Sequence, residues 1–123
     1  KGEVFKKIKI VEAVDMIKRD IKTTAEDNYI GKYANSYDNK CLLISAIKGY
    51  FTGLENEGIL ERGTSIVEID IDAQEAYLQS KGIDTSKMTL QEIKEAATDD
   101  KVFLRARIRI LDAIEDIDLN ITI

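Results

Sequence analysis

The last stretch of the chain, from Lys101 to Ile123, reads KVFLRARIRILDAIEDIDLNITI and contains two different apolar patterns. In its first part the apolar residues occupy even positions: Val102, Leu104, Ala106, Ile108 and Ile110. Three of the odd positions between them hold Arg105, Arg107 and Arg109. A period of two is typical of a β-strand with one buried and one solvated face. We therefore expect a strand here whose arginines face solvent.

The second pattern begins at residue 117, where the apolar residues move to odd positions: Ile117, Leu119, Ile121 and Ile123. One unbroken strand cannot contain both patterns, because a shift by one residue turns every side chain to the opposite face. The sequence therefore predicts a bulge, bend or turn between Leu111 and Asp116, followed by a second strand that reaches Ile123. Such a strand either folds back on its own sheet or pairs with a neighbouring chain.

The chain has 123 residues, of which 44% are hydrophobic and 33% are charged. This length and composition favour one globular domain over 1–123. The apolar runs are too short to span a bilayer, so we expect no membrane binding by this domain. The first residue is Lys1 rather than methionine, which leads us to expect a piece of a longer protein. The single cysteine, Cys41, is interpreted as a small buried core residue rather than a reactive thiol.

Charge is distributed unevenly along the chain. The net charge is −5, made up of +3 in residues 1–50, −8 in residues 51–100 and zero in residues 101–123. An acidic chain does not suit general nucleic-acid binding, so we expect no nucleic-acid partner. The split suits head-to-tail packing against copies of the same chain or against a charged scaffold. The alternative is a solvated surface that happens to be uneven.

The first half of the chain predicts one strand and two helices. Val4 to Val11 (VFKKIKIV) is interpreted as the strand. A helix is expected from about Glu12 to Tyr29, because its apolar residues recur every three or four positions. The next helix is expected from Ser36 or Asp38, either of which can cap it, to about Glu57.

Two surface features lie on these helices. Lys18, Arg19 and Lys22 form a basic cluster on the first helix, which either docks on an acidic partner or is simply solvated. Gly49 and Gly53 are four residues apart in the second helix and therefore lie on one face of it. That face suits the close approach of another backbone, from either an internal helix or another subunit.

In the second half, Ile66 to Ile71 predicts a strand with Glu68, Asp70 and Asp72 facing solvent. These carboxylates complement the arginine face of 102–110, so we expect the two strands to be antiparallel partners. Two short helices lie between them. One begins with the D-x-x-E pattern at Asp72 and ends before Gly82, and the other begins with the T-x-x-E pattern at Thr89 and runs to about Ala97.

These elements together predict an α+β fold. It consists of a mostly antiparallel β-sheet packed with about four helices, in the order β-α-α-β-α-α-β-β, with a C-terminal strand that is exchangeable between chains.

The sequence offers little material for catalysis. It contains no histidine, so the commonest general base and metal ligand is missing and no Cys-His or Ser-His pair can form. It has no zinc spacing, no Walker loop and no dinucleotide-binding glycine pattern. The acidic group Glu68, Asp70, Asp72 and Glu75 lacks the glycine and the terminal Glu of a calcium loop. We predict that the protein is not an enzyme and needs no metal and no cofactor.

Several segments, in this order, resemble the C-terminal domain of the sheath protein of contractile phage tails and phage-tail-like particles. They are Tyr29-Ile30-Gly31-Lys32 with Asn35 and Asp38, Leu42-Leu43 through Ile47 and Tyr50, Lys101-Val102-Phe103-Leu104, and Asp112-Ala113-Ile114-Glu115-Asp116-Ile117. The resemblance covers nearly the whole chain. It implies an inner, tube-proximal domain of a longer sheath protein, with the N-terminal arm and the outer domains of that protein absent from this sequence.

The resemblance also implies an arm and a hinge. The arm that pairs with a neighbouring subunit's sheet comprises Asp116, Ile117, Asp118, Leu119, Asn120, Ile121, Thr122 and Ile123. The hinge before it comprises Leu111, Asp112, Ala113, Ile114 and Glu115. The basic cluster at Lys18, Arg19 and Lys22 is then a candidate contact with the tail tube, provided that the tube surface is acidic.

The function implied by the resemblance is structural. Sheath subunits polymerise around a tail tube through exchanged strands, and the sheath contracts to drive the tube through a target envelope. The implied partners are other sheath subunits, the tail tube protein and the baseplate. The implied location is the tail of a phage or phage-like particle assembled in the bacterial cytoplasm. The alternative function is a monomeric protein-binding module whose last strand completes its own sheet.

Overall fold

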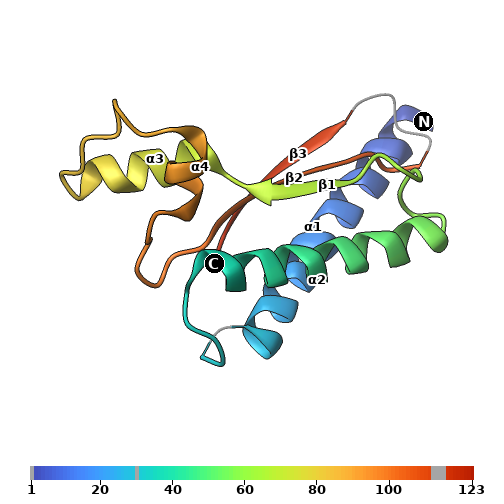
Figure 1. The fold of residues 1–123 in the computed structure, drawn as a ribbon. Helices are drawn as coiled ribbons and strands as arrows, with labels where there is room; N and C mark the ends of the chain where they lie inside the picture. Colours follow the sequence, from blue (N-terminus) through green and yellow to red (C-terminus); the bar gives the residue numbers. More distant parts are fainter. Residues whose placement is uncertain (1, 30, 112–115) are drawn as a thin grey trace.

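The computed structural model describes residues 2–29, 31–111 and 116–123 (Figure 1). The chain forms, in order, α1 (Gly2–Asn28), α2 (Tyr37–Asn56), β1 (Ile66–Ile69), α3 (Ile71–Ser80), α4 (Leu90–Glu95), β2 (Phe103–Ile108) and β3 (Ile117–Thr122). The predicted α+β class is confirmed, and so is the order of every element after the first predicted strand.

The sheet has three antiparallel strands in the order β1-β2-β3, with β2 in the middle. Leu104, Ala106 and Ile108 of β2 are fully buried, and they face the same side as Val67 of β1 and Leu119 of β3. Helices α1 and α2 contribute to the same core, which also takes in the turn residue Leu60. The even positions from Val102 to Ile108 are therefore buried, as the alternation predicts, and Ile110 is partly buried.

Helix α1 corrects the prediction at the N-terminus. The expected strand Val4–Val11 is wrong, because the helix begins at Gly2 and runs without interruption to Asn28. No Gly, Pro or Asn separates the two predicted elements, so nothing ends a strand there. The apolar stripe Val14, Ile17, Ile21 and Ala25 extends back to Ile10 with the same spacing.

Helix α2 forms where it was predicted, and it begins at a Ser36 cap. The side-chain oxygen of Ser36 accepts a hydrogen bond from the backbone N–H of Asn39 at 3.2 Å, which satisfies one of the free donors of the first turn. The buried stripe of the helix is Lys40, Leu43, Ile47, Phe51 and Leu54. Cys41 is half-buried rather than part of the core, because it lies beside this stripe.

The link between β1 and α3 is shorter than predicted. Strand β1 ends at Ile69, and Asp70 accepts a hydrogen bond from the N–H of Ala73 at 3.1 Å, so Asp70 caps α3. The expected strand to Ile71 and the expected cap at Asp72 are therefore wrong by two residues. The capping box of α4 is confirmed, with Thr89 accepting from the N–H of Glu92. Helices α3 and α4 lie together at one end of the molecule (Figure 1).

Candidate assembly interface

The C-terminal strand folds back on its own sheet in this structure. Strand β3 pairs with β2 in a register that places Leu119 opposite Ala106 and Ile108 opposite Ile117. The ladder closes with two mutual hydrogen bonds between Val102 and Ile123, at 3.0 and 2.9 Å. Strands β2 and β3 are thus antiparallel, so of the two pairings left open by the sequence the single chain adopts the folded-back one.

The other side of β3 is an open edge. Since Ile123 bonds to Val102, the odd residues of β3 direct their backbone groups toward β2, and the even residues Asp118 and Asn120 direct theirs away from it. In the described part of the chain, no strand pairs with this outer edge. Strand β3 therefore depends on a single neighbouring strand for its backbone hydrogen bonds.

A ladder of ion pairs runs across the solvent-facing side of the sheet. Arg105 binds Glu68 of β1 at 2.7 Å, Arg107 binds Asp118 of β3 at 2.8 Å, and Arg109 binds Asp116 at 3.0 Å. Arg109 also lies 3.6 Å from Glu61. The hydrogen bond from Arg107 lowers the pKa of the Asp118 carboxyl, and the bonds to Glu68 and Asp118 raise the pKa of Arg105 and Arg107 respectively.

This ladder confirms part of the predicted strand pairing. Strands β1 and β2 are antiparallel, and Glu68 is opposite Arg105 as expected. Asp70 and Asp72 do not take part, because the first caps α3 and the second lies in its first turn. The other two arginines instead pair with carboxylates that the sequence interpretation placed in the C-terminal arm.

Of the five residues expected to form the hinge, the structure describes Leu111. Asp112, Ala113, Ile114 and Glu115 are outside the described residues. Leu111 is an exposed turn residue whose N–H donates to the carbonyl oxygen of Ile59 at 2.9 Å. The described end of β2 is thus tied to the loop that follows α2.

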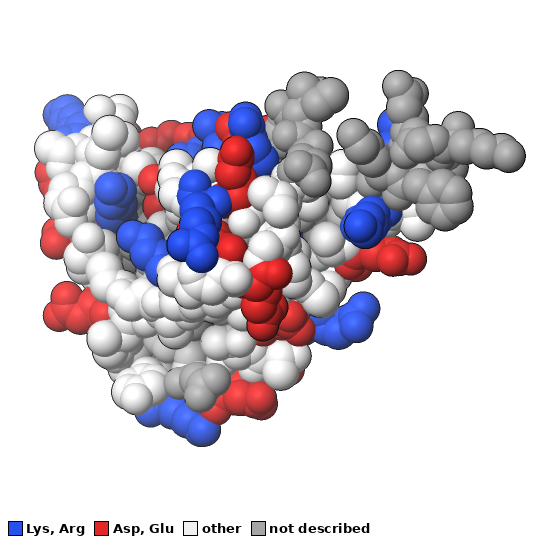
Figure 2. Space-filling view, turned by 90° about the vertical axis from the view of Figure 1, so that its right-hand side faces the viewer, with Lys and Arg blue, Asp and Glu red and all other residues white. Residues whose placement is uncertain are grey.

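The basic cluster of α1 is exposed. Lys18, Arg19 and Lys22 all face solvent, and among the described residues none of the three forms an ion pair. Elsewhere, at the end of the molecule where α2 terminates, positive and negative side chains lie interspersed (Figure 2). Charge in that view therefore does not gather into a region of one sign.

Gly49 and Gly53 leave an open face on α2. A Cβ atom built at either position would meet no heavy atom within 4 Å from the described residues, apart from its own helix backbone and chain neighbours. Of the two neighbours considered for this face, an internal helix makes no such close approach within the described residues, and another subunit stays a prediction. The face borders a hollow of about 380 Å³ between α1 and α2. At its rim, Tyr50 donates to Asp20 at 2.5 Å, and burial together with this bond raises the pKa of the phenol.

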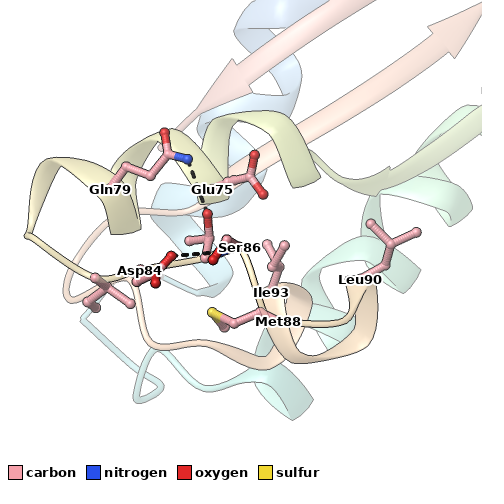
Figure 3. A pocket seen from close by; sticks show the side chains of 9 residues that line it. Glu75, Gln79, Asp84, Ser86, Met88, Leu90 and Ile93 are labelled. Carbon is pink, nitrogen blue, oxygen red and sulfur yellow. Dashed lines mark hydrogen bonds between the residues drawn. The ribbon is translucent and has the colours of Figure 1, made fainter.

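A second hollow, of about 420 Å³, lies between α3, the following loop and α4 (Figure 3). Glu75 and Gln79 approach it from α3, and Met88 and Ile93 from the other side. Four of its lining residues bond to one another, since Gln79 donates to Thr85 and Asp84 accepts from the N–H of Ser86. This arrangement stabilises the loop and offers no set of convergent donors to a ligand.

Sequence reasoning missed a buried polar cluster that joins α3 and α4 to α2. Lys40, only 1% exposed, donates to Gln74 Oε1 at 3.2 Å and to Thr98 Oγ1 at 2.7 Å. Gln74 in turn donates to the carbonyl oxygen of Ile93 at 2.6 Å, and Thr98 to that of Lys101 at 2.6 Å. Burial lowers the pKa of Lys40. We call Lys40, Gln74 and Thr98 the polar clasp.

A signal for the clasp was present in the sequence. Lys40 lies three residues before Leu43 and seven before Ile47, so it occupies the apolar stripe of α2. Asn35, one of the residues that carries the family resemblance, supports the same region. Its side-chain amide donates to the carbonyl oxygens of Asp99 at 2.7 Å and Lys101 at 2.9 Å.

Within 2–29, 31–111 and 116–123, no helix has the length and apolar character needed to cross a membrane. Over the same ranges, no group of three or more His, Cys, Asp or Glu side chains is placed to hold a metal ion. The acidic residues near β1 are instead used as an ion-pair partner and as a helix cap.

Comparison with known proteins agrees with the resemblance noted in the sequence. The family model for the phage tail sheath C-terminal domain matches residues 1–123. The chain is 42% identical over 121 residues to the tail sheath protein of Clostridium phage phiCD119, a match that covers 98% of this chain and 34% of that protein. The chain thus spans about a third of the length of this curated relative. On this evidence, the chain belongs to the phage tail sheath family.

Proposed function

We propose that this chain is the inner, tube-proximal domain of a contractile sheath subunit, and that β3 is exchanged between neighbouring subunits. Membership of the sheath family supports a structural rather than a catalytic role and assembly with other sheath subunits. In this proposal the subunits polymerise around a tail tube, and the same exchanged strands keep them linked while the sheath shortens.

The observation that carries the proposal is the way β3 is held. Among the described residues it bonds to one strand, β2, and it places Leu119, 2% exposed, against Ala106 of that strand. The surface that receives β3 consists of the free edge of β2 and the inward side chains beside it. A strand from a second copy fits that surface with the same hydrogen bonds and the same buried contacts. Exchange therefore replaces each contact rather than losing it.

The remaining parts of the proposal follow from this exchange. Leu111 to Glu115 serves as the hinge that lets β3 leave its own sheet. Lys18, Arg19 and Lys22 are free of ion pairs in the described structure and are available to an acidic tube surface. The baseplate is a further partner, and the particle assembles in the bacterial cytoplasm.

A pair of cysteines distinguishes exchange from folding back. Arg105 and Asn120 form a non-hydrogen-bonded pair, in which Cα atoms lie about 4.5 Å apart and a disulfide fits. We would introduce Arg105→Cys and Asn120→Cys into the full-length protein after replacing Cys41 and every cysteine outside 1–123 by serine, assemble it, oxidise it and separate the products under denaturing conditions. Exchange gives a series of covalent oligomers, whereas folding back gives only a cross-linked monomer.

Single-cysteine proteins provide the control. A protein with only Asn120→Cys in the same serine-substituted background can form a dimer at most, so a longer series requires both cysteines. Oxidised monomer as the main product of assembled material would contradict strand exchange.

The alternative function, a monomeric binding module, is favoured by one specific observation. In the single chain β3 completes its own sheet, as such a module requires. Deletion of 116–123 separates the two functions. A module would lose its folded state, because Leu119 belongs to its core, whereas an exchanging sheath domain would stay folded and fail to assemble. Circular dichroism and electron microscopy of the same preparation measure both properties.

A further inference from the structure

The two faces of β3 differ in how strongly they determine its register on β2. Its inward side chains are Ile117, Leu119 and Ile121, which are similar in size and all aliphatic. A slip of β3 by two residues keeps these side chains on the buried face and exchanges one aliphatic residue for another. Apart from the small Ala106 opposite Leu119, the buried side of β2 does little to distinguish the native register from such a slip.

The solvent-facing side distinguishes the registers by charge. In the observed register the three arginines of 105–109 bind different carboxylates at 3.0 Å or less: Arg105 binds Glu68, Arg107 binds Asp118 and Arg109 binds Asp116, while Glu61 is a second, more distant neighbour of Arg109 at 3.6 Å. Arg105 therefore needs nothing from β3, and the residue opposite it on β3 is the neutral Asn120. The other two arginines direct their guanidinium groups at β3.

Both slips by two residues break this one-to-one matching. If Asp118 moves opposite Arg105, it competes with Glu68, and Arg109 loses its partner on β3. If Asp118 instead moves opposite Arg109, Arg107 faces the neutral Asn120, and Ile123 no longer reaches Val102. Only the observed register gives both Arg107 and Arg109 a carboxylate from 116–123, leaves Arg105 alone with Glu68, and keeps the bonds between Val102 and Ile123.

From this matching we infer that Arg107 and Arg109 select the incoming strand. They do so by forming ion pairs with Asp118 and Asp116 of a second copy of this chain. The inference rests on the proposed strand exchange and adds to it the residues that determine partner and register. A strand that lacks carboxylates at the positions of Asp116 and Asp118, or that pairs two residues out of register, binds the edge of β2 less tightly. The receiving sheet thus binds β3 of another copy of this chain in one register.

Charge reversal in two separate proteins tests the inference. One full-length protein carries Arg107→Asp and Arg109→Asp, so its receiving edge is acidic. The other carries Asp116→Arg and Asp118→Arg, so its strand is basic. Each protein alone mismatches at every junction, and we expect its assembly at low salt to need about tenfold more protein than the wild type. Sedimentation and electron microscopy measure this threshold.

An equal mixture of the two proteins restores matching only if strands pass between chains. The acidic strand of the first protein then meets the arginines of the second, and the basic strand of the second meets the aspartates of the first. We expect the mixture to assemble close to the wild-type threshold, in alternating order. A protein with all four substitutions should assemble alone. In about 1 M salt, where charges are screened beyond about 3 Å, the defect of each single protein should shrink.

The outcomes separate this inference from the proposed function. If all variants assemble like the wild type, the charge matching is overturned while strand exchange still stands or falls on the cysteine experiment. If the fourfold variant assembles and the mixture does not, the pairs act within one chain, and both proposals fall. If neither the fourfold variant nor the mixture assembles, restoring opposite charges does not restore strand binding. The inference is then overturned, and strand exchange is still tested by the cysteine experiment.

The control exchanges a pair that does not reach β3. Glu68→Arg with Arg105→Glu changes the same kinds of charge within the receiving sheet. We expect this protein to assemble alone and to co-assemble with the wild type. A requirement for a matched partner in this control would show that general surface charge, rather than the strand-crossing pairs, controls assembly, and would overturn the inference.

Discussion

Helix α2 is attached to the rest of the molecule in two different ways along its length. From Leu43 to Leu54 it buries an apolar stripe against the sheet and α1, and Ile47 at its centre is fully buried. At its first turn the same stripe continues with Lys40, whose partners in the polar clasp are the side chains of Gln74 and Thr98. One half of the helix is thus held by apolar burial and the other by directed hydrogen bonds.

The difference lies in what each kind of contact determines. Apolar burial supplies most of the free energy of folding but has little directionality. Burial of an amino group is costly, and hydrogen bonds compensate for that cost only in a narrow geometry. We therefore interpret the clasp as fixing where α3 and α4 lie relative to α2, and the apolar stripe as supplying stability.

The largest expected effect comes from the apolar half. Leu104→Ala in β2 removes a fully buried side chain between the strands and α2, and we expect a loss of about 2–5 kcal/mol in the free energy of unfolding. Urea denaturation followed by circular dichroism measures it. Leu42→Ala is the control, because Leu42 is 59% exposed on α2 and its truncation should change stability by less than about 0.5 kcal/mol. Equal losses in the two variants would contradict the assigned core.

The next effect tests the polar half. Lys40→Ala leaves Gln74 Oε1 buried without its donor, and we expect a loss of about 1–3 kcal/mol. Lys40→Met fills most of the same volume without an ammonium group to desolvate, so its loss should be smaller. If the methionine variant lost as much stability as the alanine variant, the lost hydrogen bonds rather than the lost volume would account for the effect, and the expected order of the two variants would be contradicted.

The features that the sequence predicted correctly are those decided by neighbours a few residues apart. The alternation in 102–110 and the change of phase by 117 predicted two strands with a break between them, and both strands are present. The T-x-x-E pattern at Thr89 predicted a capping box, which forms as expected. These signals are local because backbone geometry and helix ends are satisfied by adjacent residues.

The features that were missed depend on residues far apart in the sequence, or on a segment whose local pattern is compatible with both a strand and a helix. In Val4–Val11 the alternation was interrupted at Lys6, and helix-forming lysines and the absence of a breaker let α1 extend through the segment. The clasp joins Lys40 to residues 34 and 58 positions away, so its hydrogen bonds could not be predicted from spacing alone. Arg107 could be assigned to an ion-pair face, but its partner on β3 depended on the fold of the terminal hairpin.

A smaller effect is the pH dependence of stability that arises from Lys40 at the first turn of α2. Burial lowers the pKa of Lys40 below its ordinary value of 10.5, so between those two pKa values the unfolded chain binds more protons than the folded one. The contribution of Lys40 to stability therefore increases as pH rises through this range toward 10.5. Tyrosines oppose it, because the raised pKa values of Tyr29, Tyr50 and Tyr77 make stability fall above pH 10.

The matched comparison isolates the lysine from the tyrosines. Urea denaturation of the wild type and of Lys40→Met at several pH values above neutral gives a difference in which the tyrosine contributions cancel. We expect the wild type to gain stability relative to the methionine variant as pH approaches 10.5. A difference that stays constant with pH would show that Lys40 keeps its ordinary pKa despite its burial.

The smallest expected effect lies at the far side of the clasp. Thr89→Ala removes the cap of the short helix α4 and should destabilise that helix by about 1 kcal/mol. Because Gln74 donates to the carbonyl oxygen of Ile93 in the same helix, fraying of α4 should reach the clasp before it reaches the apolar core. Hydrogen exchange should therefore speed up at the amides of α4 and leave those of β2 unchanged. Thr89→Ser keeps the capping oxygen and should behave like the wild type, whereas equal acceleration in α4 and β2 would mean that the two halves of the molecule open together.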